Sequence, residues 1–106
     1  MSEAGEAPDS TGGASIQPIV RELTIVNQKG LHARASAKFV QTVEKFDAKV
    51  RVTRGGDTVG GDSIMGLMML SAGLGSTISV AATGREAAQV IAALEALIGG
   101  GFGEGE

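Results

Sequence analysis

The chain has no cysteine, no tryptophan and no tyrosine, and it contains a single histidine among its 106 residues. The lack of cysteine excludes disulfide bridges, thiolate zinc sites and a cysteine nucleophile. A single histidine also excludes a metal site built from several imidazoles, so we expect neither a metal nor another cofactor. The three aromatic residues are all Phe, so aliphatic side chains and Met must make up most of the core.

Long apolar runs are absent as well, and those present are too short to cross a bilayer. The N-terminal segment carries Glu3, Glu6 and Asp9, and it has no apolar stretch of the kind found in secretory signals. We therefore expect a cytoplasmic protein that does not insert into membranes.

The formal net charge of −3 is unevenly distributed along the chain. All nine Lys and Arg residues lie between Arg21 and Arg85, and seven of the twelve acidic residues lie in the central region outside the two ends. The central region therefore carries a charge of about +2, nine positive against seven negative, while both ends are acidic. Nucleic-acid binding requires a much more basic surface, so no nucleic-acid partner is expected.

Composition divides the chain into three parts. Residues 1–17 are mostly Ser, Gly, Ala, Glu and Pro, which predicts a disordered N-terminal arm with little to bury. Residues 99–106 are rich in glycine, which predicts a flexible C-terminal tail. A single folded domain is expected over residues 18–98, because a chain of 106 residues has no room for a second core.

Four segments are predicted to form β-strands, three of them from the alternation of apolar and polar residues that is typical of a half-buried strand. These three are Arg21–Asn27, Lys49–Arg54 and Thr77–Ala82. The fourth, Thr58–Gly60, is short, and Gly55-Gly56-Asp57 predicts a hairpin turn that leads into it.

Three other segments show the periodicity of helices. In the first, Ala33–Glu44, the predicted buried stripe consists of Ala33, Ala37, Val40 and Val43. The second is a short helix over Ile64–Leu70. The third begins at Thr83-Gly84-Arg85-Glu86, whose spacing matches a capping box. Its apolar positions are Ala87, Val90, Ile91, Leu94, Leu97 and Ile98.

The resulting order of elements, β-α-β-β-α-β-α, predicts an α+β fold. Each strand has one polar face, so we expect a four-stranded, mainly antiparallel sheet with the three helices on one face and water on the other. Such an open-faced βαββαβα sandwich is of the ferredoxin-like or split βαβ type.

His32 is the only residue that offers imidazole chemistry, and it directly precedes the first predicted helix. A helix N-terminus has unpaired N–H groups and a partial positive charge, which bind phosphate and disfavour an imidazolium. Arg34 adds a cation that can pair with phosphate oxygens. A neutral imidazole in this setting is suited to accepting a phosphoryl group. The alternative is a surface histidine that is only solvated.

Two segments carry a family resemblance. Residues 30–41, GLHARASAKFVQ, resemble the active-site segment of HPr, the histidine-containing phosphocarrier of the bacterial phosphoenolpyruvate-dependent phosphotransferase system. Residues 62–70, DSIMGLMML, resemble the second signature of that family, around its regulatory serine. One departure is Ala35, where many members have proline, which leaves the first helical turn less rigid and adds a backbone donor.

The resemblance implies that His32 is the phosphorylated residue, on the ring nitrogen Nδ1. Arg34 would stabilise the phosphoryl group, and the backbone N–H groups of Ala33 and Arg34 would donate to it. The implied donor is enzyme I, charged by phosphoenolpyruvate, and the implied acceptor is a histidine of an EIIA protein. Such a protein is a covalent intermediate in phosphoryl transfer and not a turnover enzyme, and a monomer is expected.

Ser63 has two interpretations. Asp62 or Ser63 is an ordinary N-cap for the short helix. By resemblance, Ser63 is also the serine that HPr kinase/phosphorylase modifies. A phosphate there would add negative charge beside the docking surface without unfolding the domain.

The short helix after Ser63 has more apolar residues than one buried face can hold. The resemblance places Ile64, Met65 and Met68 on a surface for partner proteins, to which Lys38 would also belong, and it places Leu67 and Leu70 inward. The alternative is that the methionines fill an irregular core.

Two other functions stay open. The first is a nitrogen- or carbon-signalling module in which the phosphorylation state of His32 controls binding to regulator proteins. The second is an RNA-binding ferredoxin-like domain, which is disfavoured because the strands lack aromatic residues for base stacking.

Overall fold

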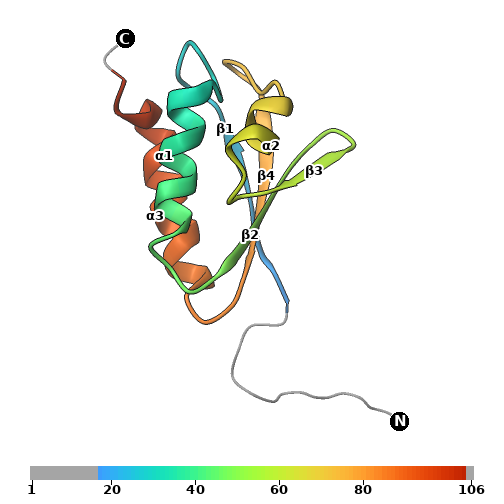
Figure 1. Ribbon diagram of the computed structural model, residues 1–106, viewed down its shortest axis with the longest axis vertical. Coiled ribbons are helices and arrows are strands. Elements are labelled where there is room, and N and C mark those ends of the chain that lie inside the picture. Colours follow the sequence, from blue (N-terminus) through green and yellow to red (C-terminus); the bar gives the residue numbers. More distant parts are fainter. Residues whose placement is uncertain (1–16, 105–106) are drawn as a thin grey trace.

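The computed structural model describes residues 17–104, in which strands and helices follow the predicted order (Figure 1). The strands are β1 (Ile19–Thr24), β2 (Lys49–Arg54), β3 (Asp57–Gly60) and β4 (Thr77–Thr83). The helices are α1 (Ala33–Val43), α2 (Ile64–Met69), α3 (Ala87–Gly99) and a short 3-10 helix, η1 (Gly101–Gly103). No helix in this part of the chain has the length and apolar character that a membrane crossing requires. Apart from Gln17, the predicted disordered arm lies outside the described residues.

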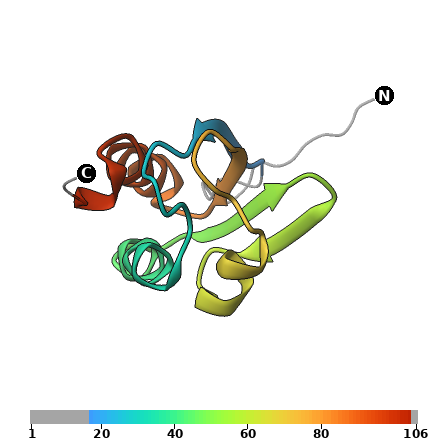
Figure 2. The same cartoon turned by 90° about the horizontal axis from the view of Figure 1, so that it is seen from above.

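The strands form one antiparallel sheet in the order β1-β4-β2-β3. Leu23 of β1 pairs with Ile78 of β4, and Val52 of β2 pairs with Val80 of β4. Viewed from above, all three α-helices lie on one side of this sheet (Figure 2). The predicted open-faced α+β sandwich is therefore confirmed, and the sheet is antiparallel throughout.

The core lies between the sheet and the helices. In β2 and β4 every second residue is buried, as strand geometry requires when one face of a sheet is covered. The inward residues of these strands pack against the buried faces of α1 and α3. Among the side chains of this core are Phe39, Val50, Val52, Ile78, Val80, Val90 and Leu94.

α1 buries a different stripe from the predicted one. Its buried residues are Ala35, Ser36, Phe39, Val40 and Val43, whereas Ala33 is exposed and Ala37 is half-buried. Burial of the large Phe39 side chain turns Ala35 and Ser36, one turn earlier on the same face, toward the core. The prediction was right at Val40 and Val43 and wrong at Ala33 and Ala37, because alanine gives only a weak signal for one face of a helix.

α3 begins without the predicted capping box. Thr83 is the last residue of β4, and the N-cap of α3 is Glu86, whose side chain makes no capping bond. Instead, Oε1 of Glu86 accepts the backbone N–H of Asp47 at 2.7 Å. Glu86 therefore ties the start of α3 to the loop between α1 and β2.

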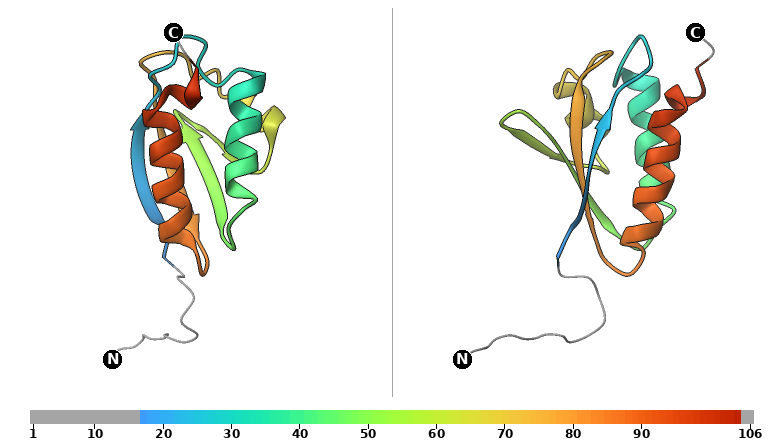
Figure 3. Two further views of the ribbon diagram at one scale, coloured as in Figure 1. Left: turned by 90° about the vertical axis from the view of Figure 1, so that its left-hand side faces the viewer. Right: turned by 180° about the vertical axis from the view of Figure 1, so that it is seen from behind.

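The C-terminal residues differ from the predicted flexible tail. α3 continues to Gly99, and the chain then turns back in η1, where the side chain of Phe102 is buried with only 1% exposed. The backbone runs through φ values of +66° at Gly101, +58° at Phe102 and +72° at Gly103. The glycines permit this left-handed turn, and the burial of Phe102 holds it. Figure 3 shows this turn beside the N-terminal end of α1.

Candidate functional site

The segment that leads into α1 is held by the loop that precedes β4. Gly30 has φ +62°, and a Cβ at this position would lie 2.3 Å from the carbonyl oxygen of Ala72, so only glycine fits there. The buried Leu31 donates its backbone N–H to the same Ala72 oxygen at 2.9 Å. These contacts fix the backbone immediately before His32.

His32 is the N-cap residue of α1, with an extended backbone (φ −74°, ψ −178°) and a side chain that does not cap the helix. Its carbonyl accepts the N–H of Ser36 at 2.8 Å. The N–H groups of Ala33, Arg34 and Ala35 have no acceptor within residues 17–104. These unpaired donors lie at the positive end of the helix dipole, where an anion is stabilised.

A cleft of about 670 Å³ lies beside this helix start. The side chain of His32 is 27% exposed, so the ring can be reached without being fully solvated. Arg34 is exposed, and its guanidinium has no partner among the described residues. The structure therefore brings together the predicted residues His32, Ala33 and Arg34. The full lining is Lys29, His32, Ala33, Arg34, Lys38, Gly103 and Glu104.

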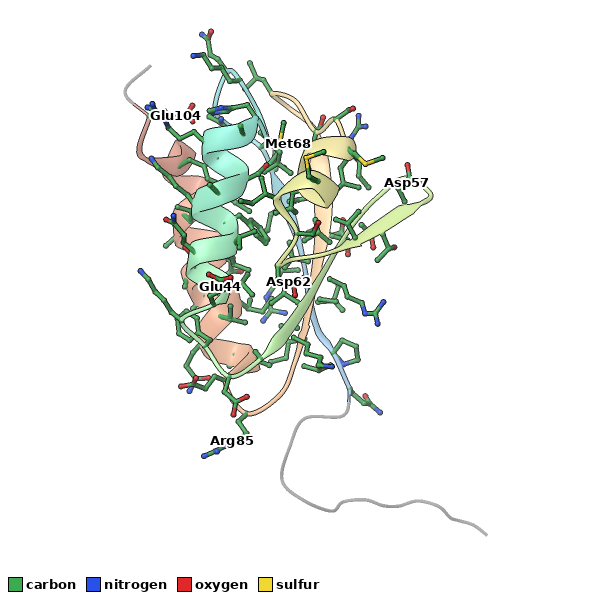
Figure 4. All side chains as sticks on the ribbon, viewed as in Figure 1. Glu44, Asp57, Asp62, Met68, Arg85 and Glu104 are labelled. Atoms are coloured by element: carbon green, nitrogen blue, oxygen red, sulfur yellow. The ribbon has the colours of Figure 1, made fainter. Side chains whose placement is uncertain are left out.

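Glu104, which follows η1, closes one side of the cleft (Figure 4). Its Oε2 lies 2.5 Å from Nε2 of His32, and its side chain is only 15% exposed. Its other oxygen, Oε1, accepts the side-chain amide of the buried Asn27 at 3.2 Å. The same amide group donates to the carbonyl of Gly30 at 2.9 Å. Asn27 thus connects the loop before His32 with the carboxylate that contacts its ring.

Lys38 has a contact that the sequence did not predict. Its ammonium group donates to the carbonyl of Phe102 at 2.6 Å and so holds η1 against α1. Glu104 and Asn27 were not predicted at the site either. The only signal in the sequence was Phe102, an isolated large apolar residue in a run of glycines.

Ser63 is the N-cap of α2, and its hydroxyl oxygen accepts the N–H of Gly66 at 2.9 Å. Leu67 in the helix that follows is buried, and so is Leu70, the residue directly after that helix, as the resemblance implied. The outer side of α2 is apolar, and we call its four exposed residues, Ile64, Met65, Met68 and Met69, the α2 patch. The resemblance did not single out Met69, which at 76% is the most exposed of the four.

Comparison with known families adds an independent result. The model of a family described as "PTS HPr component phosphorylation site" matches residues 19–99, which is nearly the whole described chain. The chain belongs to the HPr family. HPr proteins are phosphocarriers of the phosphotransferase system, and this confirms the resemblance seen in the two sequence segments.

Two curated relatives and one solved structure show how far the similarity to HPr extends. The phosphocarrier protein HPr of Cupriavidus necator is 49% identical over 86 residues, which cover 81% of this chain and 97% of that protein. The phosphocarrier protein NPr of Shewanella violacea is 37% identical over 84 residues, covering 79% and 92%. The crystal structure of HPr-C-His from Thermoanaerobacter tengcongensis has a TM-score of 0.79 at 38% identity, covering 83% of this chain and 99% of that one.

Proposed function

We propose that His32 accepts a phosphoryl group from phosphoenolpyruvate-charged enzyme I and passes it to a histidine of an EIIA protein. The observation that carries this proposal is the position of His32, a partly exposed imidazole at the start of α1, where three successive backbone N–H groups have no acceptor in the described chain. No cofactor is needed for this role, because the imidazole itself holds the transferred group. The protein is then a carrier that becomes covalently modified and not a turnover catalyst.

In each transfer, the lone pair of Nδ1 of His32 attacks phosphorus while the bond from phosphorus to the donor's histidine breaks. The electron pair of that bond returns to the donor ring, so the exchange needs no other reactant. The N–H groups of Ala33 and Arg34, which have no acceptor in the described chain, would donate to the phosphoryl oxygens, and the unpaired guanidinium of Arg34 would supply positive charge. Positioning and charge neutralisation are the main contributions a protein makes to phosphoryl transfer.

The surface proposed to dock enzyme I and the EIIA protein is the α2 patch. Its residues Ile64, Met65 and Met68 are 40%, 69% and 38% exposed, respectively. Flexible methionine side chains suit a surface that must fit several unlike partners. Lys38, which the resemblance also assigns to this surface, donates its ammonium to the carbonyl of Phe102 and so is not free to pair with a partner in this arrangement.

We also propose Ser63 as a regulatory phosphorylation site for an HPr kinase/phosphorylase. Its half-exposed side chain lies at the start of α2, directly before the α2 patch. A phosphate there would be compatible with the N-terminal end of a helix and would place negative charge beside the docking surface.

A second candidate function is a signalling module whose His32 phosphorylation state controls binding to regulator proteins. The surface of α1 and its C-cap is compatible with this candidate, since the uncharged Gln41 and the acidic Glu44 are exposed and Lys38 is held by the C-terminal turn. A pull-down with phosphorylated and unmodified protein distinguishes the two candidates. Capture of regulators, with no EIIA protein accepting the phosphoryl group, would favour the signalling module.

Incubation with enzyme I and radiolabelled phosphoenolpyruvate tests the main proposal. We expect one acid-labile label per chain, because phosphohistidine is hydrolysed in acid and phosphoserine is not. His32→Ala should abolish labelling and leave the far-UV circular dichroism spectrum unchanged, since the His32 side chain makes no helix-capping bond. Full labelling of His32→Ala would move the phosphorylation site to another residue.

A further inference from the structure

The contact between His32 and Glu104 links two segments that are 72 residues apart. Nε2 of the ring and Oε2 of the carboxylate are separated by 2.5 Å, and both side chains are largely buried, with 27% and 15% exposed. An ionised carboxylate can only accept hydrogen bonds, so the hydrogen atom between the two groups belongs to Nε2. A neutral imidazole has one protonated nitrogen, and the lone pair of His32 is therefore on Nδ1.

We propose that Glu104 is a positioning residue for phosphoryl transfer, which keeps the ring proton of His32 on Nε2 and leaves Nδ1 as the nucleophile. This inference rests on the proposed function of His32. It adds a residue from the C-terminal turn, which neither of the two segments that carry the family resemblance contains.

Glu104 is held in place by contacts on several sides. The buried Phe102 anchors the turn, and its carbonyl accepts the ammonium of Lys38 at 2.6 Å. The backbone N–H of Glu104 donates to Gly101 at 3.1 Å. The amide of Asn27 donates to Oε1, which leaves Oε2 directed at the ring. The carboxylate therefore reaches His32 in an orientation set by the fold.

The charge balance of the transfer step gives Glu104 a second effect. When Nδ1 forms the bond to phosphorus, the ring proton stays on Nε2 and the ring becomes positively charged. The donor's histidine takes the electron pair of the broken bond, so no proton needs to leave His32. A carboxylate at Nε2 stabilises the positive ring, as the aspartate of a catalytic triad stabilises its histidine. Glu104 should therefore favour the phosphorylated form as well as the attack.

The position of the ring proton can be measured without any partner protein. Long-range ¹⁵N–¹H correlation spectra of the unmodified protein, recorded in alkaline buffer, distinguish the two neutral tautomers of His32. We expect an almost pure Nε2–H form in the wild type, with a downfield Nε2–H proton. Glu104→Gln should give a mixture of tautomers and lose the downfield signal, because its amide is neutral and can also donate. Glu104→Asp, which keeps the charge, should largely retain the Nε2–H form.

Glu95→Gln is the matched control. Glu95 lies on the exposed side of α3 and pairs with Arg21 at 3.6 Å, so its replacement removes the same charge at a distance from the cleft. This control should leave the tautomer and the rate of phosphoryl acceptance unchanged. Glu104→Gln should lower the rate of acceptance from enzyme I and the equilibrium fraction of phosphorylated protein, each by roughly tenfold, as expected for loss of a charge-assisted hydrogen bond.

The two readouts separate failure of this inference from failure of the proposed function. An unchanged tautomer in Glu104→Gln would overturn the positioning role, whatever the transfer rate. Faster acceptance by Glu104→Gln would also overturn it, because the carboxylate would then be repelling the incoming phosphoryl group. A wild-type protein that accepts no phosphoryl group from enzyme I would overturn the proposed function, while the tautomer measurement would still report on the contact itself.

Discussion

Ala35 shows how a single residue changes the donor set at the start of α1. It is fully buried in the first turn of the helix, and its N–H has no acceptor among the residues that the structure describes. A proline at this position would fix φ but would remove that donor. With alanine, the proposed anion site keeps three consecutive N–H groups and gives up some rigidity of the first turn.

Arg34 carries the unpaired positive charge of the same site, and its replacement tests whether that charge contributes to transfer. We expect Arg34→Ala to slow phosphoryl acceptance from enzyme I by about 10- to 100-fold, since hydrogen bonds to charged groups contribute about 1.5–3 kcal/mol. Arg34→Lys should lose less, because it keeps the charge but lacks the planar two-pronged geometry. Single-turnover labelling by enzyme I measures both rates.

The control for Arg34 is Arg51→Ala, which removes the same charge from an exposed position on β2. It should transfer at the wild-type rate. If Arg34→Ala and Arg51→Ala were equally slow, the effect would come from net charge and not from a contact with the phosphoryl group. A wild-type rate for Arg34→Ala would remove Arg34 from the site.

At the scale of elements, the sequence predicts what depends on regular periodicity. The alternation in β2 and β4 and the apolar spacing of α3 predict the buried residues there correctly, including Ile78, Val80 and Leu94. The errors occur where local patterns compete with tertiary contacts. The threonine and glutamate of the expected capping box are used by β4 and by the backbone of Asp47 instead.

The C-terminal turn was mispredicted for a related reason. A run of glycines is compatible with a flexible chain and also with the positive φ values of η1, and composition alone does not separate the two. The ordered turn is favoured because Phe102 packs into the hydrophobic core, and that core forms only once the helices and the sheet are packed together. The sequence therefore predicted His32 and Arg34 but missed Glu104, which this turn brings to the ring.

Phe102→Ala tests whether the turn depends on this buried side chain. We expect a loss of about 1–3 kcal/mol in the free energy of unfolding, less than a Phe in the middle of a core, because a terminal turn can open locally. Urea denaturation gives the loss in stability, and amide hydrogen exchange at Gly103 and Glu104 reports the opening of the turn. Both amides donate within the turn, to Gly100 and Gly101, so their protection should be lost.

Leu74→Ala is the comparison for Phe102→Ala, since Leu74 is an apolar side chain that is 60% exposed. It should change the free energy of unfolding by less than about 0.5 kcal/mol. If Phe102→Ala also left stability and amide exchange unchanged, Phe102 would not anchor the turn. The position of Glu104 at the ring would then need another explanation.

At the scale of the whole molecule, the proposed phosphoryl site and the proposed docking surface lie at the same end. Figure 4 shows Met68 of α2 and Glu104 of the C-terminal turn near this end, on either side of the start of α1. The loops that precede α1 and β4 meet there as well, through the hydrogen bond from Leu31 to Ala72. A partner that covers the α2 patch can therefore bring its own histidine to the cleft without a change in the fold.

Ser63→Asp tests whether negative charge at this end controls docking. Aspartate is a good N-cap and its charge is favourable at a helix N-terminus, so the free energy of unfolding should change by less than about 0.5 kcal/mol. The KM for acceptance from enzyme I should rise about fivefold, or about 1 kcal/mol, with little change in kcat, because a charge at the rim of an interface acts mainly on association. The rise in KM should diminish as salt is added.

Ser63→Ala separates charge from capping, because it removes the hydroxyl that accepts the N–H of Gly66 and adds no charge. This variant should lose about 1 kcal/mol in the free energy of unfolding and retain the wild-type KM. The opposite pattern, a KM raised by Ser63→Ala and unchanged by Ser63→Asp, would mean that docking depends on the shape of α2 and not on its charge. Phosphorylation of Ser63 would then have no electrostatic route to regulating the transfer, and the regulatory role proposed for it would be overturned.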